Sequence, residues 1–376
     1  MSDLRDRVEV SVVMPCLNEA ATIAACIRTA REGLARVTQA GEVVVADNGS
    51  TDGSQEIAAR EGARVVRVAA RGYGHAYRGG IAASSGRTIV MGDSDGTYDF
   101  SRLDEIVRPL DNGADLVLGS RLRGAIRPGA MPWLHRYIGN PLLSGVLNLF
   151  YRTRVADTHS GFRAFTRAAY DRLRLRTGGM EFASEMLIAA AREGLRIVEV
   201  PITYHPRSGE SKLRSFRDGW RHLRLLLLYS PTHLFTIPGI AMAVAGLLLI
   251  GALVPGSVRI GAFFFDFHFM FVGSLLAILG TQVALLGLFA RAGIAGVPRW
   301  FTLERGLVGG GALLSAGIAA NLVILIRWIT SGFGPLNAVR PAIVALTLMA
   351  VGAQLLFSSF YLDLVRAEAP SDDEHV

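Results

Sequence analysis

The chain has 376 residues, of which 51% are hydrophobic and 19% are charged, and its formal net charge is +7. This length is enough for one catalytic domain and a membrane part, and the two cysteines, Cys16 and Cys26, exclude a disulfide framework. The basic residues are not clustered with aromatic residues, which argues against nucleic acid as a partner and favours an anionic membrane surface or a phosphate-bearing substrate.

Short apolar strands alternate with amphipathic helices in the first half of the chain. Ligands of sheets built this way bind at the carboxyl ends of the strands. The alternation predicts an α/β fold with a mostly parallel sheet that is covered on both faces. Residues 1–9 are charged and do not predict a signal peptide. We expect strands at 10–14, 43–46, 64–68, 88–91 and 116–118, and helices at 20–34, 54–61, 77–84 and 103–110.

A pair of carboxylates follows the strand at 88–91. Asp93 and Asp95 are separated only by Ser94, and two carboxylates at this spacing can hold Mg²⁺ or Mn²⁺ against a diphosphate. A cation held there would neutralise charge on a departing nucleoside diphosphate. On its own, however, this D-x-D pattern is more typical of a solvated acidic turn.

Two further polar segments, 15–19 and 47–52, follow the first two predicted strands. A strand followed by Asp, Gly, Ser and Asp offers acceptors for a base and a ribose, and a turn in which the backbone can approach a ligand. Asn18 and Ser50 are also good helix-capping residues, so either segment alone has a structural explanation. Three polar strand ends in one parallel sheet are harder to attribute to capping, and they indicate a ligand site.

Two amphipathic segments come next, at 140–151 and 216–229. The second combines arginines, Trp220 and a run of leucines, which is typical of a helix that lies in the membrane interface. For both segments the alternative is an ordinary helix that packs on the core.

Four apolar stretches follow, and each is long enough for a helix to cross a membrane: 234–254, 267–290, 307–326 and 342–362. Gln282, in the second stretch, is expected to face a neighbouring helix. The loop after the second stretch is rich in arginine, whereas the loop after the first has a single basic residue, Arg259. This asymmetry predicts that the arginine-rich loop, the soluble domain and the acidic tail are cytoplasmic, although Arg327 and Arg340 fall on the opposite side. The predicted parts are a catalytic domain at 1–213, an interfacial helix at 214–230, a four-helix transmembrane domain at 231–364 and an acidic tail at 365–376.

Several of these motifs, taken in order, resemble the family 2 glycosyltransferases. The likeness is close to the bacterial and archaeal relatives of dolichyl-phosphate mannose and glucose synthases. It covers residues 8–228 and implies a GT-A-like nucleotide-sugar-binding domain, whereas the membrane half matches only in kind. The stretches that carry it are 12–19, 44–53, 72–80, 89–95, 119–121, 157–165 and 200–213.

The resemblance also implies which residues form the site. Asp93 and Asp95 would hold the metal, Mg²⁺ or Mn²⁺, but Thr97 stands where many members carry a glutamine, which leaves a third metal ligand open. Catalysis would depend on Asp95, Asp157, Arg121 and Arg136. The lipid phosphate would be bound by Arg121, Arg136 and Asn140. The nucleotide and the donor would be bound by Pro15, Asn18, Glu19, Asp47, Ser50, Asp52, Gly74, Asp93, Ser94, Arg207, Ser211 and Lys212.

Other motif residues have structural or undecided roles. Residues 72–74 are expected to form a turn near the nucleotide, and the segment from Arg207 to Lys212 a loop that closes over the donor. Glu181 and Glu185 lie one helical turn apart, and they either contact sugar hydroxyls or form a solvated helix edge. The histidines of the matching stretches, His159 among them, are expected to be structural.

The resemblance implies an integral membrane enzyme that transfers a hexose, with inversion, from a nucleotide-sugar to polyprenyl phosphate. Its catalytic domain would lie at the cytoplasmic face of a bacterial-type inner or plasma membrane. A phosphate monoester is already anionic near neutral pH, so such an acceptor needs no strong general base. The first expectation for the donor is UDP-glucose and the alternative is GDP-mannose, with an N-acetylated hexosamine also open. A homo-oligomer is left open too.

Three other functions are disfavoured by particular residues. A processive polysaccharide synthase of the same family would carry a Gln-x-x-Arg-Trp motif, which the sequence lacks. Transfer to a different lipid or to a protein is disfavoured by Arg121 and Arg136. A non-enzymatic membrane scaffold or transporter is disfavoured by the intact Asp93–Asp95 pair and by Ser211 with Lys212.

Overall fold

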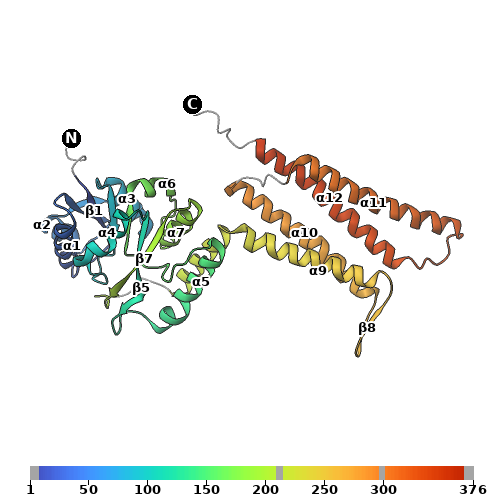
Figure 1. The fold of residues 1–376 in the computed structure, drawn as a ribbon, viewed down its shortest axis with the longest axis horizontal. Helices are drawn as coiled ribbons and strands as arrows, with labels where there is room; N and C mark the ends of the chain where they lie inside the picture. The colour runs from blue at the N-terminus through green and yellow to red at the C-terminus, as the bar shows by residue number, and fades with distance from the viewer. Residues whose placement is uncertain (1–7, 209–214, 296–300, 368–376) are drawn as a thin grey trace. The chain divides into compact units, whose positions relative to one another are not determined.

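The computed structural model describes residues 8–208, 215–295 and 301–367. The chain divides into two compact units, Met1–Leu226 and Leu227–Val376, and each is described by itself. The first unit, drawn in blue to green in Figure 1, is built on a sheet. This sheet has seven strands in the order β3-β2-β1-β4-β6-β5-β7. Its strands are β1 (Val10–Cys16), β2 (Gly41–Asp47), β3 (Arg64–Arg67), β4 (Thr88–Met91), β5 (Leu116–Ile126), β6 (Arg163–Thr166) and β7 (Ile197–Tyr204).

One strand of this sheet runs against its neighbours. β1 pairs in parallel with β2 and β4, and β5 pairs in parallel with β7. β6 is inserted antiparallel between β4 and β5, so that Arg163 lies opposite both Met91 and Leu118. The end of β4 that leads to Asp93 and the part of β5 that leads to Arg121 are therefore separated by a single strand.

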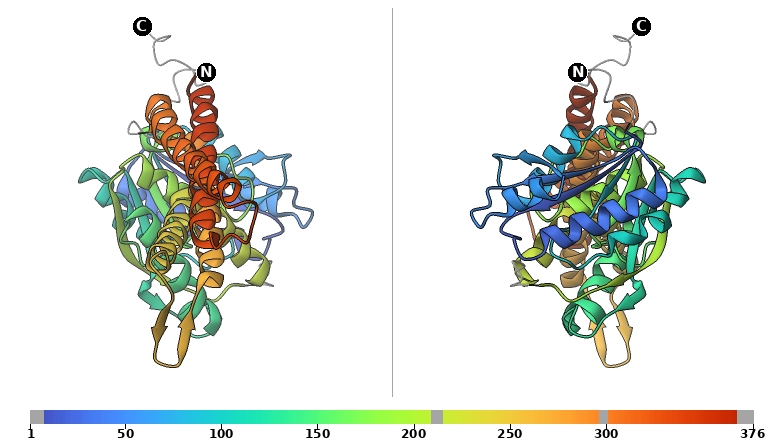
Figure 2. Two further views of the ribbon diagram at one scale, coloured as in Figure 1. Left: turned by 90° about the vertical axis from the view of Figure 1, so that its right-hand side faces the viewer. Right: turned by 90° about the vertical axis from the view of Figure 1, so that its left-hand side faces the viewer.

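Helices cover both faces of the sheet (Figures 1 and 2). On one face, Val12 of β1 belongs to a core shared with α1 (Ile23–Val37) and α4 (Leu103–Asp111). On the other face, Val13 lies against Gly80 of α3 (Tyr73–Ala83), because successive strand residues point to opposite sides. Strands buried on both faces need continuous apolar runs, which is why β1 is not alternating. The other helices of this unit are α2 (Ser54–Arg60), α5 (Asn140–Tyr151), α6 (Arg167–Leu173), α7 (Phe182–Arg192) and α8 (Ser215–Leu228).

The predicted mostly parallel α/β fold is confirmed, but three local predictions were wrong or incomplete. β5 continues to Ile126, so residues 119–121 lie within the strand and do not follow it. Residues 72–74 do not form a turn, because Gly72 precedes α3 and Tyr73 opens it. Neither β6 nor β7 was predicted, and β6 is only four residues long.

Large apolar side chains are exposed on α5, on the turn before it and on α8. Leu142 and Leu149 of α5 are 61% and 69% exposed, and Trp133 and Tyr137, just before it, are 66% and 58% exposed. Trp220 of α8 is 59% exposed. A helix that only packs on the core would turn such side chains inward, so these segments are amphipathic with an apolar outer surface.

The second unit consists mainly of long apolar helices. Within residues 227–295 and 301–367, four spans are long and apolar enough to cross a membrane: Thr232–Leu253, Phe267–Ala292, Leu303–Thr330 and Val339–Val365. The predicted stretches therefore correspond to helices of the right length and composition. These spans belong to α9 (Ile237–Leu253) with the turn before it, α10 (Phe267–Ala295), α11 (Leu303–Thr330) and α12 (Val339–Ala367), and α9 is joined to α10 through the hairpin β8 (Val258–Ile260) and β9 (Phe263–Phe265).

Glycines bring these helices together in two close pairs, α9 with α10 and α11 with α12. A Cβ atom added at Gly239 would lie 2.3 Å from the backbone nitrogen of Ala284. A Cβ added at Gly352 would lie 2.5 Å from the backbone nitrogen of Leu314. Only glycine allows backbones to approach this closely, which is a common way for helices to associate in a membrane.

Polar side chains link α10 to α12 between the two pairs. Nε2 of Gln354 donates to Oε1 of Gln282 over 3.0 Å, and the hydroxyls of Ser274 and Thr347 are 2.7 Å apart. In hydrocarbon an amide needs such a partner, because no water is present to replace it. The expectation that Gln282 faces a neighbouring helix is confirmed.

Candidate active site

The loops after β1 and β2 are tied to each other by hydrogen bonds. Oδ1 of Asn18 accepts from the backbone N–H of Thr51 (2.8 Å), and Oγ of Ser50 accepts from the backbone N–H of Asn18 (3.0 Å). Asp52 accepts from the backbone N–H of Ala20 (2.9 Å). Asn18 has a φ of 55°, which asparagine tolerates better than most residues. The fold therefore brings the predicted nucleotide residues of both loops together, as their position after neighbouring parallel strands implies.

Asp47 has a structural task within this edge. Its carboxylate accepts from the backbone N–H groups of Gly49 (3.0 Å) and Ser50 (3.3 Å), and from Nε2 of Gln55 (2.7 Å). The side chain is almost fully buried, at 2% exposed. It stabilises the turn in which Gly49 adopts a φ of 97°, a conformation that favours glycine. Part of the polar pattern after β2 thus serves the turn itself.

The ends of β1 and β4 are joined through Ser94. Its hydroxyl donates to the carbonyl of Pro15 (2.6 Å), and its own carbonyl accepts from the hydroxyl of Thr22 (2.7 Å). Ser94 is 2% exposed. This residue therefore fixes the turn that carries Asp93 and Asp95 relative to the loop after β1.

Asp93 is surrounded by hydroxyl groups. The phenol groups of Tyr73 and Tyr77, one helical turn apart on α3, both donate to its Oδ1 (3.0 and 3.1 Å). Its Oδ2 lies beside Gly161, where an added Cβ would be only 2.8 Å from it. Burial, together with the nearby charge of Asp95, raises the pKa of Asp93 to about 7.

Asp95 is held in a different way. The backbone N–H and the hydroxyl of Thr97 both donate to its Oδ1 (3.1 and 2.6 Å). Its Oδ2 lies 3.6 Å from Nε of Arg207, whose Nη2 is 2.8 Å from Oε1 of Glu19. Thr97 is therefore bonded to the carboxylate next to it, a contact that orients Asp95.

The donor set at this turn fits a divalent cation. Tyrosine and threonine hydroxyls engage only Oδ1 of Asp93 and of Asp95, so Oδ2 of each would face a metal, with Arg207 moving away from Oδ2 of Asp95. Burial and the charge of Asp95 raise the pKa of Asp93, and a bound cation would favour the ionised carboxylate. Among the described residues no group of three or more His, Cys, Asp or Glu side chains converges, so the protein would supply few of the ligands. Mg²⁺ and Mn²⁺ accept such sites because substrate phosphates and water complete their coordination.

The segment after β7 runs beside the same turn. The backbone N–H of His205 donates to the carbonyl of Thr97 (3.0 Å), and that of Ser208 donates to the carbonyl of Asp95 (3.4 Å). Arg207 is thereby directed towards both carboxylates described above. Ser211 and Lys212, the other predicted donor-binding residues of this segment, lie outside the described residues.

Arg121 and Asp157 form a buried ion pair. Nε and Nη2 of Arg121 each donate to a different oxygen of Asp157 (2.7 Å each), and the backbone N–H of Arg121 adds a third bond (2.9 Å). The two residues are 7% and 0% exposed. Asp157 outweighs burial and raises the pKa of Arg121 above its usual value. The Arg121 guanidinium also lies over the ring of Tyr204, 5.1 Å from its centroid.

This pairing corrects one expectation. The resemblance implied a catalytic role for Asp157, but both of its oxygens are used by Arg121 and the side chain is fully buried. Asp157 therefore orients Arg121. A bidentate pair of this kind fixes the plane of the guanidinium, so its remaining N–H groups point in a defined direction.

Arg136 and Asn140 lie on the turn His135–Gly139 and at the start of α5. Arg136 is exposed, with its guanidinium 5.3 Å from the ring centroid of Tyr137. Asn140 is half-buried, and its Nδ2 lies 3.6 Å from the sulfur of Met131. Partial burial and the charge of Arg121 lower the pKa of His135, which puts the start of this turn within electrostatic range of Arg121.

Two other predicted residues lie elsewhere than expected. Gly74 is inside α3, and a Cβ there would lie 2.6 Å from the carbonyl of Thr177, so its small size serves packing. Glu185 is neither at a solvated helix edge nor open to a sugar. It is buried, and it accepts from the backbone N–H groups of Arg176 (3.0 Å) and Thr177 (2.9 Å).

Sequence reasoning missed the tyrosines around Asp93. Tyr73 and Tyr77 are spaced i,i+4, which places both on one face of α3 and was visible in the sequence. Tyr98, whose hydroxyl accepts from the backbone N–H of Gly161 (2.8 Å), had no such signal, because its partner is 63 residues away.

His159, expected to be structural, is packed edge-to-face on His222 with 4.5 Å between ring centroids.

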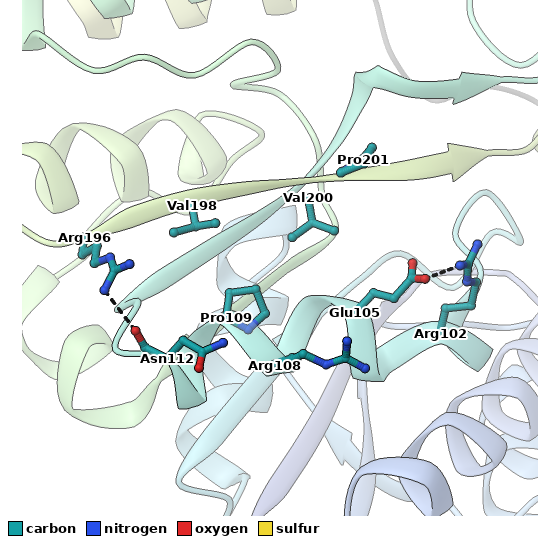
Figure 3. A pocket seen from close by; sticks show the side chains of 9 residues that line it. All are labelled: Arg102, Glu105, Arg108, Pro109, Asn112, Arg196, Val198, Val200 and Pro201. Atoms are coloured by element: carbon teal, nitrogen blue, oxygen red, sulfur yellow. Dashed lines mark hydrogen bonds and ion pairs between the residues drawn. The ribbon is translucent and has the colours of Figure 1, made fainter.

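A separate cavity of about 580 Å³ lies between α4 and β7 (Figure 3). None of the predicted site residues lines it. Its arginines already have partners, since Arg102 pairs with Glu105 and Arg196 donates to the carbonyl of Asn112. This cavity is therefore distinct from the edge of the sheet that carries Asp93 and Asp95.

Comparisons with known proteins identify the family of the chain. Residues 11–174 match the model of glycosyl transferase family 2, and residues 290–366 match that of the glycosyltransferase family 2 C-terminal transmembrane region. A low-salt glycan biosynthesis hexosyltransferase of Haloferax volcanii, Agl6, is 43% identical over 365 residues, which are 94% of this chain and 88% of that protein. A dolichyl-phosphate hexose transferase of the same organism is 33% identical over 212 residues, 56% of this chain and 89% of that protein.

Among solved structures, one of glucosyl-3-phosphoglycerate synthase from Mycobacterium tuberculosis in complex with phosphoglyceric acid is similar, with a TM-score of 0.47 and 25% identity. The similarity covers 61% of this chain and 82% of that one. The match to the transmembrane region, together with the long apolar helices of the second unit, makes the chain an integral membrane protein. Since the relative that is 43% identical matches nearly the whole chain, the protein belongs to glycosyltransferase family 2.

Proposed function

We propose that this glycosyltransferase moves a hexose from a nucleotide-sugar to polyprenyl phosphate, with inversion at the anomeric carbon. The observation that carries the proposal is that the proposed metal site for the donor diphosphate and the arginine site for the acceptor phosphate lie close together in the sheet. Asp93 and Asp95 follow β4, Arg121 and Asp157 meet at β5, and only β6 stands between them. The names of the relatives, a glycan biosynthesis hexosyltransferase and a dolichyl-phosphate hexose transferase, support the same substrate classes.

The donor would bind along the ends of β1, β2 and β4. Pro15, Asn18, Glu19, Asp47, Ser50 and Asp52 would shape the pocket for the nucleoside, some by contact and some through the turns that they stabilise. UDP-glucose is the first candidate and GDP-mannose the second. Arg207, held between Glu19 and Asp95, would turn to the donor diphosphate, because a guanidinium can bind phosphate oxygens at two points.

Mg²⁺ or Mn²⁺ bound by Asp93 and Asp95 would supply Lewis-acid stabilisation of the diphosphate leaving group. The residues around the pair prepare it for that task. Tyr73, Tyr77 and Thr97 donate to one oxygen of each carboxylate, which fixes the orientation of the other oxygen. Orienting groups of this kind tune the affinity of a metal site.

The acceptor phosphate would be bound by Arg121 and Arg136. Asp157 would keep Arg121 in place through the two bonds described above. Exposed apolar side chains near Arg136 in the sequence, namely Trp133, Tyr137 and Leu142, support a position of this segment in the membrane interface. There the headgroup of the lipid acceptor could reach the protein while its tail stays in the bilayer. We place the catalytic domain at the cytoplasmic face, where nucleotide-sugars are made.

The reaction needs little proton transfer. The second ionisation of a phosphate monoester falls at about pH 6, so the acceptor phosphate is mostly a dianion at neutral pH. It would attack the anomeric carbon as the bond from that carbon to the diphosphate oxygen breaks, and the electron pair leaves with the nucleoside diphosphate. Holding two anions in line is then the main work of the protein, and arginine and aspartate are suited to it.

The test is a screen of UDP-glucose, GDP-mannose and UDP-N-acetylglucosamine with purified full-length protein, Mn²⁺ or Mg²⁺, and a polyprenyl phosphate. The expected product is a single hexose on the lipid phosphate, labile to mild acid and dependent on the lipid. Formation of a polymer would instead indicate a polysaccharide synthase. If none of the nucleotide-sugars labels the lipid, while the protein binds its donor, the proposed acceptor is wrong.

A further inference from the structure

Arg163 carries a positive charge that the reaction described above does not use. It opens β6 and is fully buried, at 0% exposed. Its Nε donates to the carbonyl of Ser160 (2.9 Å), its Nη1 to that of Ala183 (2.6 Å) and its Nη2 to that of Thr158 (2.8 Å). Burial lowers the pKa of Arg163 to about 10, so the side chain still carries its charge at neutral pH.

All three acceptors are main-chain carbonyls and none is a carboxylate, so no opposite charge bonds to the buried guanidinium of Arg163. Removing a charge from water carries a large desolvation penalty, and no carboxylate bonds to Arg163 to offset it. An apolar side chain would fill the same volume without this cost. What an apolar side chain cannot do is hold three main-chain carbonyls from two segments, the loop 158–160 and the start of α7.

The loop that Arg163 holds connects the two halves of the site. At one end, Asp157 binds Arg121 through both carboxylate oxygens. At the other end, Gly161 lies against Oδ2 of Asp93 and donates its N–H to Tyr98. Residues 158–160 therefore lie between the group proposed to receive the acceptor and the group proposed to receive the donor.

We propose that Arg163 is a positioning residue that sets the distance between the Arg121–Asp157 pair and Asp93, by clamping the loop between them. The inference rests on the function proposed above. Arg163 bonds to none of Asp93, Arg121 and Asp157. Its loss should therefore change the position of the Arg121–Asp157 pair relative to Asp93 more than it changes the geometry within either site. Transfer to the lipid needs both halves in line, whereas hydrolysis of the donor by water needs only the donor half.

The experiment compares Arg163→Met and Arg163→Lys with a matched control, Arg167→Met. Arg167 also donates to main-chain carbonyls, those of Gly86 (2.9 Å), Ser84 (3.0 Å) and Ile81 (3.4 Å), but at the opposite end of β6. In the full-length protein, three quantities are measured: transfer to polyprenyl phosphate, hydrolysis of the nucleotide-sugar without acceptor, and Mn²⁺-dependent donor binding. A melting temperature is recorded for each variant.

For Arg163→Met we expect transfer to fall about 100-fold, the scale of a misplacement near 1 Å, while hydrolysis and donor binding stay within about three-fold. Arg163→Lys keeps the charge but has fewer N–H donors, so its ratio of transfer to hydrolysis should lie between those of the wild type and Arg163→Met. For Arg167→Met the ratio should equal that of the wild type, whatever happens to the melting temperature. Combining Arg163→Lys with Arg121→Lys should give less than the product of the single effects, because both act on the same pair.

The positioning role is overturned if Arg163→Met lowers transfer and hydrolysis by the same factor, or leaves transfer unchanged. Should Arg163→Met fail to fold, the Arg163→Lys ratio decides, and a wild-type ratio rejects the role. A wild-type protein that hydrolyses its donor but never glycosylates the lipid would overturn the proposed function, and this inference with it. The two failures are therefore distinguished by the wild-type measurement.

Discussion

Gly161→Ala is the substitution that most directly tests how closely the loop before β6 packs on the carboxylate pair. A Cβ at this position would lie 2.8 Å from Oδ2 of Asp93, 2.9 Å from the Tyr73 hydroxyl and 3.3 Å from the Tyr98 hydroxyl. A carbon-to-oxygen contact is usually no shorter than about 3.3 Å, so Asp93 or the loop must move by roughly 0.5 Å. The backbone itself can accept alanine, since Gly161 is not among the glycines with positive φ.

The expected result is a catalytic loss with a modest loss of stability. A displacement of about half an ångström at a reacting centre should lower kcat by roughly 10- to 100-fold, on the scale by which about 1 Å costs about 100-fold. Overpacking by one methyl group should lower the free energy of unfolding by about 1 to 3 kcal/mol. The Mn²⁺ concentration for half-maximal activity should rise, because the moved oxygen is the one proposed to face the metal.

The assay is the initial rate of lipid glycosylation against Mn²⁺ and donor concentration, with thermal melting of the same preparations. Gly309→Ala is the control, because a Cβ at Gly309 in α11 would meet no atom within 4 Å. That variant should match the wild type in rate and metal dependence. Wild-type kcat and metal dependence in Gly161→Ala would refute the close packing of this loop on Asp93.

Three further outcomes are expected. Asp95→Asn keeps the shape of the side chain but removes a charge at the proposed metal site, so transfer should fall by at least about 100-fold while the melting temperature changes little; near-normal transfer would reject the metal role. Arg121→Lys loses the two-point contact with the buried Asp157, and we expect a free energy of unfolding lower by about 3 kcal/mol and a raised KM for the lipid phosphate, with donor KM unchanged. Burial, followed by the charge of His222, holds the pKa of His159 well below its usual value. The folded state therefore resists protonation of His159 and loses stability as pH falls below the unfolded value of about 6.5. His159→Asn should flatten the dependence of melting temperature on pH between about 7 and 5, and an unchanged slope would show that His159 is not responsible.

Local patterns predicted the parts of the fold that depend on neighbours along the chain. The runs that form β1 and β2 are apolar because both faces of the sheet are covered, and the polar residues after them must lie at one edge. The same reasoning located Asp93 and Asp95 correctly after β4. The membrane spans were equally visible, because a helix that crosses hydrocarbon needs a long apolar run.

The remainder depends on pairings between distant segments. β6 is four residues long and antiparallel, and its place between β4 and β5 is specified by partners far away in sequence. The bond between Asp157 and Arg121 spans 36 residues, so the aspartate could not be recognised as an orienting residue from its motif. Glu185 illustrates the converse, since a charged side chain spaced like a surface residue is buried as the partner of two backbone N–H groups.

The glycine contacts of the second unit restrict how that unit can change shape. Where α9 meets α10 and where α11 meets α12, backbone lies against backbone, leaving no room for an acyl or isoprenoid chain to slip between. Across the α10–α12 contact, by contrast, the bonds are made by side-chain amides and hydroxyls, which can rotate while the backbones stay apart. Any rearrangement that accompanies release of the proposed lipid product should therefore occur as a shift of one helical hairpin against the other.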